Sequence, residues 1–219
     1  MFSKILFAII ASPKFKVLNR RFKKNAEFKI LDVGCAKSAA KTKKYFKNCL
    51  YYGLDYLEKS DIGEEELKMI EQYHKIDLVK DNLSGLSDNF FDAIIMTHTL
   101  EHIKNGLSVI EELAAKLKNK GIIYIEFPSV RSLSLPSMSG SLNFCDDPEH
   151  IKIYDIKEVA NVLLSAGFKI IKAGTRRDPL KSIFTPLTYL YFKCIRRIPA
   201  AVSLWDICGF ADYVLAEKR

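Results

Sequence analysis

Short apolar segments that alternate with helical patterns from residue 28 onward constrain the fold of this 219-residue chain more than any other feature. Strands are expected at residues 28–33, 50–54, 73–76, 91–96, 122–125, 168–172 and 211–216, and helices at 38–47, 64–72, 107–117 and 155–165. Strands that alternate with helices predict a mainly parallel sheet covered on both faces. Ligands of such sheets bind beyond the carboxyl ends of the strands, so the residues that follow each strand are the first candidates for function.

The first expected strand runs into a turn of small residues, and the segment reads Ile30-Leu-Asp-Val-Gly-Cys-Ala-Lys-Ser38. Gly34 permits a sharp turn, and Ala36 leaves room for a ligand to approach the backbone. Many α/β proteins have such a turn for packing alone, but Asp32 adds a chemical constraint. Its carboxylate is a poor neighbour for the pyrophosphate of a dinucleotide, whereas it suits the ammonium and sulfonium groups of S-adenosylmethionine. The segment therefore favours a sulfonium cofactor.

The second expected strand ends in another acid, in the segment Tyr51-Tyr-Gly-Leu-Asp55. Asp55 stands 21 positions after Gly34, close to the offset of about 20 expected for an acid that binds a ribose. A carboxylate accepts two hydrogen bonds in the geometry that a cis-diol offers. Taken alone, Asp55 is better explained as a cap of the next segment, but together with Asp32 and Gly34 it favours ribose binding.

A further motif follows the fourth expected strand and reads Phe91-Asp-Ala-Ile-Ile-Met-Thr-His-Thr-Leu-Glu-His-Ile103. With these three motifs the chain resembles the class I S-adenosylmethionine-dependent methyltransferases, of the type 11 or type 23 kind, over roughly residues 28–175 and the last strand. The resemblance implies a Rossmann-like three-layer α/β sandwich with a seven-stranded, mostly parallel sheet whose last strand is antiparallel. The family more often has glycine where this chain has Ala36 and Ser38, which loosens the match but keeps small residues at the turn.

The resemblance also implies which residues bind the cofactor, S-adenosyl-L-methionine. Asp32, Gly34 and Ala36 line the methionine end of the cofactor, and Asp55 binds the ribose hydroxyls. Asp77, which follows the third strand, holds the adenine amino group, and Leu78 packs on the adenine ring. Thr97 and His98 lie beside the sulfonium. The whole implied cofactor site comprises Asp32, Gly34, Cys35, Ala36, Asp55, Tyr56, Asp77, Leu78, Thr97 and His98.

Histidines are the candidates for a base that assists methyl transfer, because their pKa lies near neutrality. His150 is the first choice, since it lies in the long loop after the fifth strand that is expected to cover the acceptor. His102 is the second choice, although packing or capping explains it equally well. The four-residue spacing of His98 and His102 suits a metal, but the sequence shows no third ligand, so no metal site is expected.

Two segments of the chain are strongly basic. Residues 1–25 carry a net charge of +7 and residues 176–197 of +5, in a chain whose total is +8. We expect a basic N-terminal helical segment at 1–26, and a methyltransferase domain at 27–219 with an insertion at about 175–209. The insertion contains a basic amphipathic stretch at 187–198. Its apolar stripe favours a helix that covers the core or a dimer contact over one that lies in a membrane interface.

The expected function is methyl transfer to oxygen or nitrogen of a small-molecule, glycan-linked or lipid-linked acceptor. The alternatives are an RNA methyltransferase and a non-catalytic scaffold that binds a membrane or a protein. Nucleic acid is the weaker partner, because no Asn/Asp-Pro-Pro-Tyr motif follows the fourth strand, whereas an anionic membrane surface suits the basic segments. Five cysteines without a CxxC pair suit a reducing compartment, so the expected location is the cytoplasm or the inner membrane surface.

Overall fold

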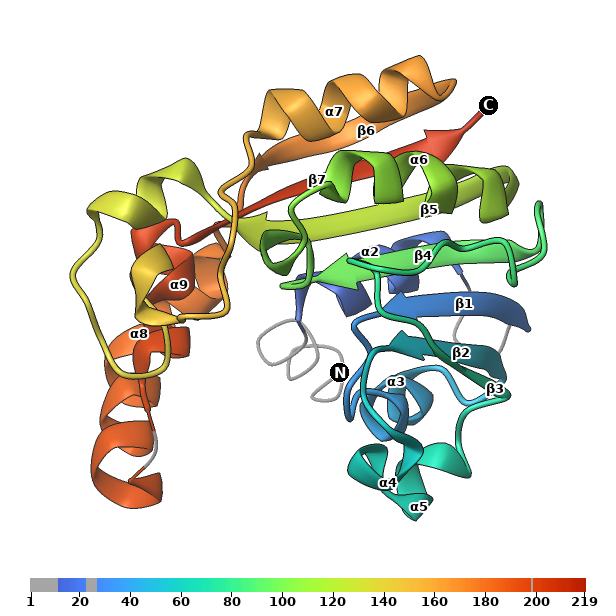
Figure 1. The fold of residues 1–219 in the computed structure, drawn as a ribbon. Coiled ribbons are helices and arrows are strands. Elements are labelled where there is room, and N and C mark those ends of the chain that lie inside the picture. The colour runs from blue at the N-terminus through green and yellow to red at the C-terminus, as the bar shows by residue number, and fades with distance from the viewer. Residues whose placement is uncertain (1–11, 23–26, 198) are drawn as a thin grey trace.

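A computed structural model describes residues 12–22, 27–197 and 199–219, and these form a single twisted sheet with helices on both faces (Figure 1). The strands are β1 Phe28–Val33, β2 Cys49–Asp55, β3 Gln72–Lys75, β4 Phe91–Thr97, β5 Leu117–Pro128, β6 Phe168–Thr175 and β7 Ala211–Lys218. Their order is β3-β2-β1-β4-β5-β7-β6. The first five are parallel, and β7 runs antiparallel to both β5 and β6. The predicted fold class is therefore confirmed.

Two groups of helices cover the sheet. The helices of the domain are α2 Pro13–Arg21, α3 Ala39–Tyr45, α4 Lys59–Ile62, α5 Glu64–Leu67, α6 Gly106–Lys116 and α7 Ile156–Ser165, with 3₁₀ turns η1 Leu100–His102, η2 Val130–Ser134 and η3 Phe144–Asp146. Buried residues of α6 and α7 pack on one face of the sheet. Buried residues of α2 and α3 pack on the other face.

The residues of β1 alternate between these two apolar layers. Leu31 and Val33 belong to the layer with α6 and α7, and Ile30 belongs to the layer with α2 and α3. A strand covered on both faces has no polar side to show, which is why the segment reads as a continuous apolar run in the sequence. The same alternation turns Asp32 toward α2 and α3.

The expected helix at 64–72 is wrong over its second half. Its acidic start forms α5, but the helix ends at Leu67, and Gln72 is already the first residue of β3. The acids of its first turn favour a helix start by complementing the helix dipole. None of the residues of α5 is buried, however, so tertiary packing does not stabilise a longer helix. The following residues pair with β2 as strand β3 instead.

Of the predicted basic segment 1–26, the structure describes residues 12–22, and the other residues lie outside the described part of the chain. The described residues form α2, whose Phe15 and Leu18 are fully buried against the sheet. In this part of the segment the basic charge is therefore carried by a helix that packs on the domain.

The insertion between β6 and β7 folds into α8 Pro179–Leu190, the π-helix η4 Tyr191–Arg196 and α9 Ala201–Cys208. They project from the carboxyl end of the sheet, at lower left in Figure 1. The apolar stripe expected to be covered is open: Leu187, Leu190, Tyr191 and Ile195 are 44–72% exposed, and Ile198 lies outside the described residues. Within this single chain the stripe does not cover the core. In the part of the chain that the structure describes, no helix is long and apolar enough to span a bilayer.

Candidate functional site

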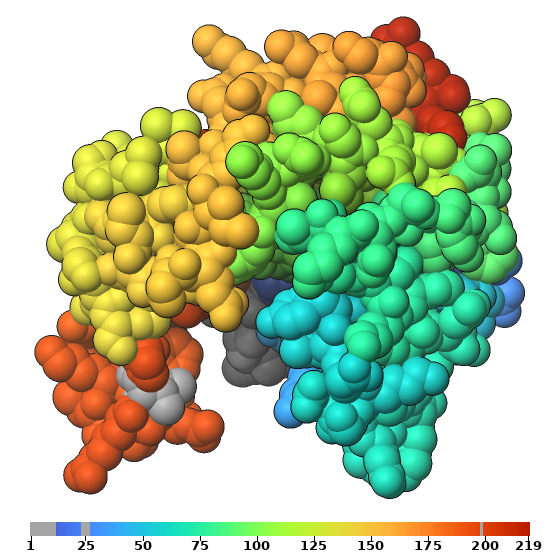
Figure 2. Space-filling view, viewed as in Figure 1, coloured from blue at the N-terminus to red at the C-terminus, as the bar shows by residue number. Residues whose placement is uncertain are grey.

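Two cavities open beyond the carboxyl ends of the strands, where the surface is hollowed between the insertion and the β2–β3 side of the sheet (Figure 2). The first, of about 620 Å³, is lined by residues that follow β1, β2, β3 and β4 and by part of the loop before α7. The second, of about 740 Å³, lies between α2, α3 and the insertion. His98 lines both of them.

The turn after β1 forms one wall of the first cavity. Gly34 has φ +71°, and its N–H donates to the Leu54 carbonyl at 2.8 Å. A Cβ atom at this position would lie 2.1 Å from Oγ1 of Thr99, so the turn needs glycine both for its φ and for its close approach to the segment after β4. Ala36, also at positive φ, lies on the cavity wall.

Asp55 joins this turn to the end of β2. Its carboxylate is almost completely buried, accepts the Ala36 N–H at 2.8 Å and accepts the Leu57 N–H at 3.3 Å. These two bonds fix the carboxylate in the cavity wall. Farther along, Asp77 lines the same cavity. A hydrogen bond from Lys80 lowers the pKa of Asp77 and keeps it ionised.

The wall of the first cavity is mainly acidic. The described residues that line the first cavity include the acids Asp55, Asp77 and Glu149 and no lysine or arginine. A pyrophosphate in this place would meet three carboxylates and no lysine or arginine, and the basic side chains of the wall are the histidines His98 and His102. The wall fits a ligand without phosphate that offers hydroxyl donors and carries positive charge.

Three of the predicted cofactor residues do not line this cavity. Asp32 lies beneath the turn, where one oxygen accepts from Tyr51 Oη at 2.9 Å and from Lys14 Nζ at 3.1 Å. Its other oxygen, Oδ1, is buried and has no partner among the described residues. The Cys35 thiol is packed in the core, and burial raises its pKa to about 12. Thr97 lines the second cavity instead.

His98 lies between the two cavities. Its backbone adopts a strained conformation, with φ +53°. Its Nδ1 lies 3.3 Å from Glu101 Oε1, and its Nε2 lies 3.2 Å from Glu126 Oε1. Burial lowers the pKa of His98, but its hydrogen bonds to Glu101 and Glu126 outweigh burial and raise the pKa to about 9. Both ring nitrogens therefore donate, and His98 is an imidazolium at neutral pH.

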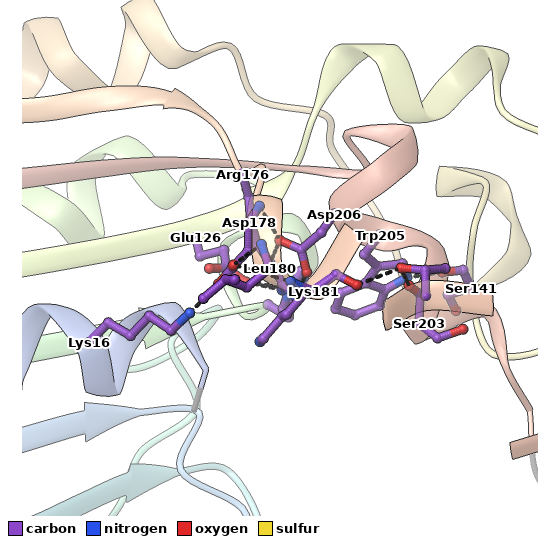
Figure 3. A network of polar contacts seen from close by, with 12 residues as sticks. Lys16, Glu126, Ser141, Arg176, Asp178, Leu180, Lys181, Ser203, Trp205 and Asp206 are labelled. Carbon is purple, nitrogen blue, oxygen red and sulfur yellow. Dashed lines mark hydrogen bonds and ion pairs between the residues drawn. The ribbon is translucent and has the colours of Figure 1, made fainter. Parts of the chain in front are cut away.

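Glu126 and Arg176 belong to a buried polar network that joins the sheet to the insertion (Figure 3). Nη1 of Arg176 donates to Glu126 Oε1 at 2.9 Å, and its Nη2 and Nε donate to the two oxygens of Asp206 in α9 at 2.8 and 3.2 Å. Burial by itself raises the pKa of Glu126, but the charge of Arg176 outweighs this and holds it well below its usual range. Glu126 is thus a permanent anion that faces His98.

The wall of the second cavity combines aromatic and cationic side chains. Its apolar members are Phe184, Tyr191, Phe192, Val202 and Trp205, and its cationic members are Lys14, Lys41, Arg176 and Lys181. Arg176 is neutralised by Glu126 and Asp206, and Lys14 by Asp32. Lys181 forms no ion pair with any described residue, and burial lowers its pKa. Such a wall suits a ligand with an apolar body and an anionic group.

Residues 7–173 match the family model described as methyltransferase domain, which is more than half of the chain. The chain belongs to this methyltransferase family. The resemblance to S-adenosylmethionine-dependent methyltransferases that the sequence motifs indicated is thereby confirmed. The family match ends just before the insertion, whose helices form much of the second cavity.

Individual relatives are distant. The ubiquinone biosynthesis O-methyltransferase of Dechloromonas aromatica (strain RCB) is 29% identical over 100 residues, which are 44% of this chain and 43% of that protein. The match therefore spans less than half of the length of that curated relative. Among solved structures, an S-adenosylmethionine-dependent methyltransferase from Mesorhizobium loti has a TM-score of 0.65 at 14% identity, covering 96% of this chain and all of that one. One from Archaeoglobus fulgidus has a TM-score of 0.58 at 19% identity, covering 99% of both. At these identities the structures show the shared fold.

In this methyltransferase, the predicted cofactor residues Gly34, Ala36, Asp55, Tyr56, Asp77, Leu78 and His98 come together around the first cavity. Of the two predicted catalytic histidines, His102 lines that cavity and His150 lines neither cavity. The rings of His102 and His150 nevertheless lie 5.1 Å apart, because the loop before α7 returns to η1.

Glu126, Arg176, Lys181 and Trp205, which line the second cavity, are not among the residues that the sequence predicts for the site. Glu126 could have been predicted, since it is an acid that directly follows the apolar segment 122–125, as Asp55 follows the expected strand 50–54. The other three lie after β6, where the sequence shows basic and apolar residues but not which of them turn inward.

Proposed function

We propose that this methyltransferase binds S-adenosylmethionine in the first cavity and transfers its methyl group to an acceptor in the second. The observation that carries the proposal is the mainly acidic wall of the first cavity, with three carboxylates and, besides the histidines, no basic side chain among its described residues. In this arrangement Asp55 accepts from the ribose hydroxyls, and Asp77 accepts from the adenine amino group while Leu78 packs on the ring. The cofactor supplies an activated methyl group on a sulfonium.

The contribution of the protein is chiefly alignment. Methyl transfer is an in-line displacement, so donor and acceptor must meet end to end, and orientation alone lowers the barrier of such a step substantially. The only described residue that both cavities share is His98, which makes its surroundings the meeting point. As an imidazolium with both nitrogens engaged, His98 positions the ligands and does not act as the base.

For the acceptor we propose a molecule with an apolar or aromatic body and an anionic group. The aromatic side chains of α8, η4 and α9 contact the body. Lys181 pairs with the anion, since this half-buried cation forms no ion pair with a described residue. This chemistry is shared by small aromatic acids and by phosphate-bearing glycan or lipid precursors. The exposed apolar and basic residues of α8 and η4 add support for a lipid-linked source. Contact of this surface with an anionic membrane stays a prediction.

Calorimetry with S-adenosylhomocysteine tests the cofactor site. We expect binding by the wild-type protein and a loss of about 10- to 100-fold in affinity for Asp55→Ala, because hydrogen bonds to a charged group contribute about 1.5–3 kcal/mol. Glu111→Ala, which removes an exposed acid of α6 away from both cavities, is the matched control and should bind like the wild type. A folded wild-type protein that binds no S-adenosylhomocysteine at millimolar concentration would favour the non-catalytic scaffold.

A further inference from the structure

Three groups that bind metals come together beside the first cavity. Glu101 and His102 lie in η1 after β4, and His150 lies in the loop that precedes α7. One donor atom from each of the three side chains lies within 4.8 Å of the other two. His150 is distant from η1 in the sequence, so only the return of the loop across the sheet edge assembles the group.

The hydrogen bonds of the two rings fix where their protons lie. His102 Nδ1 donates to the Glu149 carbonyl at 2.9 Å, and His150 Nδ1 donates to the Phe144 carbonyl at 2.6 Å. A carbonyl only accepts, so in each neutral ring Nδ1 carries the proton and Nε2 carries the free electron pair. A backbone carbonyl on the other nitrogen is the usual support of a histidine that binds a metal.

The carboxylate of Glu101 lacks a complete set of partners. It is 1% exposed, and its Oε1 lies 3.3 Å from His98 Nδ1 and 3.8 Å from His150 Nε2. Its Oε2 is buried and has no hydrogen-bond partner among the described residues. Burial of an unsatisfied carboxylate oxygen is costly, and a cation bound next to it would remove that cost. The Asp147 carboxylate, 3.8 Å from His150 Nε2, offers a further oxygen.

We propose that Glu101, His102 and His150 bind one divalent transition-metal ion, of which Zn²⁺ fits the ligands best. Two imidazoles and one carboxylate form a common zinc site, with the fourth position open to water or to a further carboxylate such as Asp147. Mg²⁺ and Ca²⁺ fit less well because they prefer oxygen ligands. Donor atoms about 2.0–2.2 Å from an ion lie closer together than 4.8 Å, so the three side chains move inward when the ion binds.

Such an ion fastens the loop before α7 to η1 at the edge of the first cavity. Pro148 and Glu149 of this loop line the cavity together with His102. The ion therefore orders the wall around the cofactor. It also occupies the free electron pairs of His102 and His150, which gives these two predicted bases a binding role.

Zinc binding by the purified full chain, freed of metal with a chelator, tests the proposal without any measurement of methyl transfer. We expect about one equivalent of Zn²⁺ bound in competition with a chromophoric chelator. His150→Ala and His102→Ala should each lower the affinity by about 100-fold or more, because each removes one of three protein ligands. His74→Gln, which changes a histidine in β3 outside the cluster, should bind Zn²⁺ like the wild type.

Co²⁺ provides a readout that needs no variant. Bound to two imidazoles and a carboxylate, it should give visible absorption bands of a four- or five-coordinate site, and Zn²⁺ should remove these bands while millimolar Mg²⁺ leaves them. The proposal is overturned if the wild type shows no such bands, or if folded His150→Ala and His102→Ala bind Zn²⁺ as tightly as the wild type. A protein that binds S-adenosylhomocysteine but no Zn²⁺ would overturn this inference alone.

Discussion

His98 illustrates how surroundings decide the chemistry of one residue. Its position after β4 gave only a place near the cofactor, whereas its contacts with Glu101 and Glu126 give it a charge at neutral pH. The charge of Glu126 is itself maintained by Arg176. An acid, a histidine and an arginine from three segments thus form one ionised row between the two cavities.

This charge predicts a pH-dependent contribution to stability. The pKa of His98 is about 9 in the folded protein and about 6.5 in the unfolded chain, so its stabilisation is complete below pH 6.5 and is lost as the pH rises through 9. We expect the difference in free energy of unfolding between wild type and His98→Gln to shrink by up to about 3 kcal/mol from pH 6 to pH 10. Urea unfolding at both pH values measures it.

His74 supplies the opposite control. Burial lowers its pKa, so its neutral form is favoured in the folded state and no stabilisation is lost as the pH rises. The difference between wild type and His74→Gln should therefore not shrink over the same range. A His98→Gln difference that is equal at pH 6 and pH 10 would show that His98 is not an imidazolium in the folded protein.

Among the elements, the insertion is attached to the sheet by an apolar contact of Ala201 in α9 with Phe210 and Ala211, and by polar contacts. Both α8 and η4 leave large apolar side chains exposed. Asp206 of α9 is held by the bidentate Arg176, which follows β6, and Trp205 Nε1 donates to the Ser141 carbonyl at 2.8 Å. A second ion pair, between Lys16 of α2 and Asp178, fastens the start of α8.

Arg176→Ala should therefore destabilise the protein by about 3–5 kcal/mol, because it leaves the buried carboxylate of Asp206 without its cation and that of Glu126 with His98 alone. Hydrogen exchange should rise most in α8 and α9. Arg177→Ala is the matched control, since Arg177 is exposed and, among the described residues, its side chain donates to the Ile207 carbonyl alone. Equal unfolding midpoints in urea for the two variants would mean that the network does not hold the insertion.

At the scale of the whole molecule, two cavities with different chemistry meet at one residue. The first has acidic side chains and no lysine or arginine among its described lining, and the second has aromatic and cationic side chains. The family fold accounts for the first, while the insertion accounts for most of the second. The different linings of the two cavities predict that the cofactor and the acceptor bind at separate sites.

The single tryptophan of the chain, Trp205, lines the second cavity, so its fluorescence reports ligand binding in that cavity. We expect an alkyl phosphate such as decyl phosphate, below its micellar concentration, to change the fluorescence of Trp205 with saturation. Decanol, which lacks the anion, should bind at least about 10-fold more weakly, and Lys181→Met should remove that preference. Equal responses to both ligands would contradict an anionic acceptor.

The sequence by itself determined the order of the strands along the chain, the helix-bearing layers and seven of the predicted cofactor residues that line the first cavity. It did so because buried strands are apolar throughout and because Gly34, Asp55 and Asp77 lie at or just after the end of a strand. Their place depends only on where parallel strands end, and those ends all lie at one edge of the sheet.

Only the tertiary structure decided which distant groups meet. Strand alternation turned Asp32 away from the cavity toward Lys14, and the loop before α7 brought His150 to Glu101 and His102. The insertion carried Arg176 to Glu126 and Trp205 to His98. Each of these contacts depends on the path of a connection and on the side to which a side chain turns. Local pattern does not encode either one, because both follow from the packing of the whole chain.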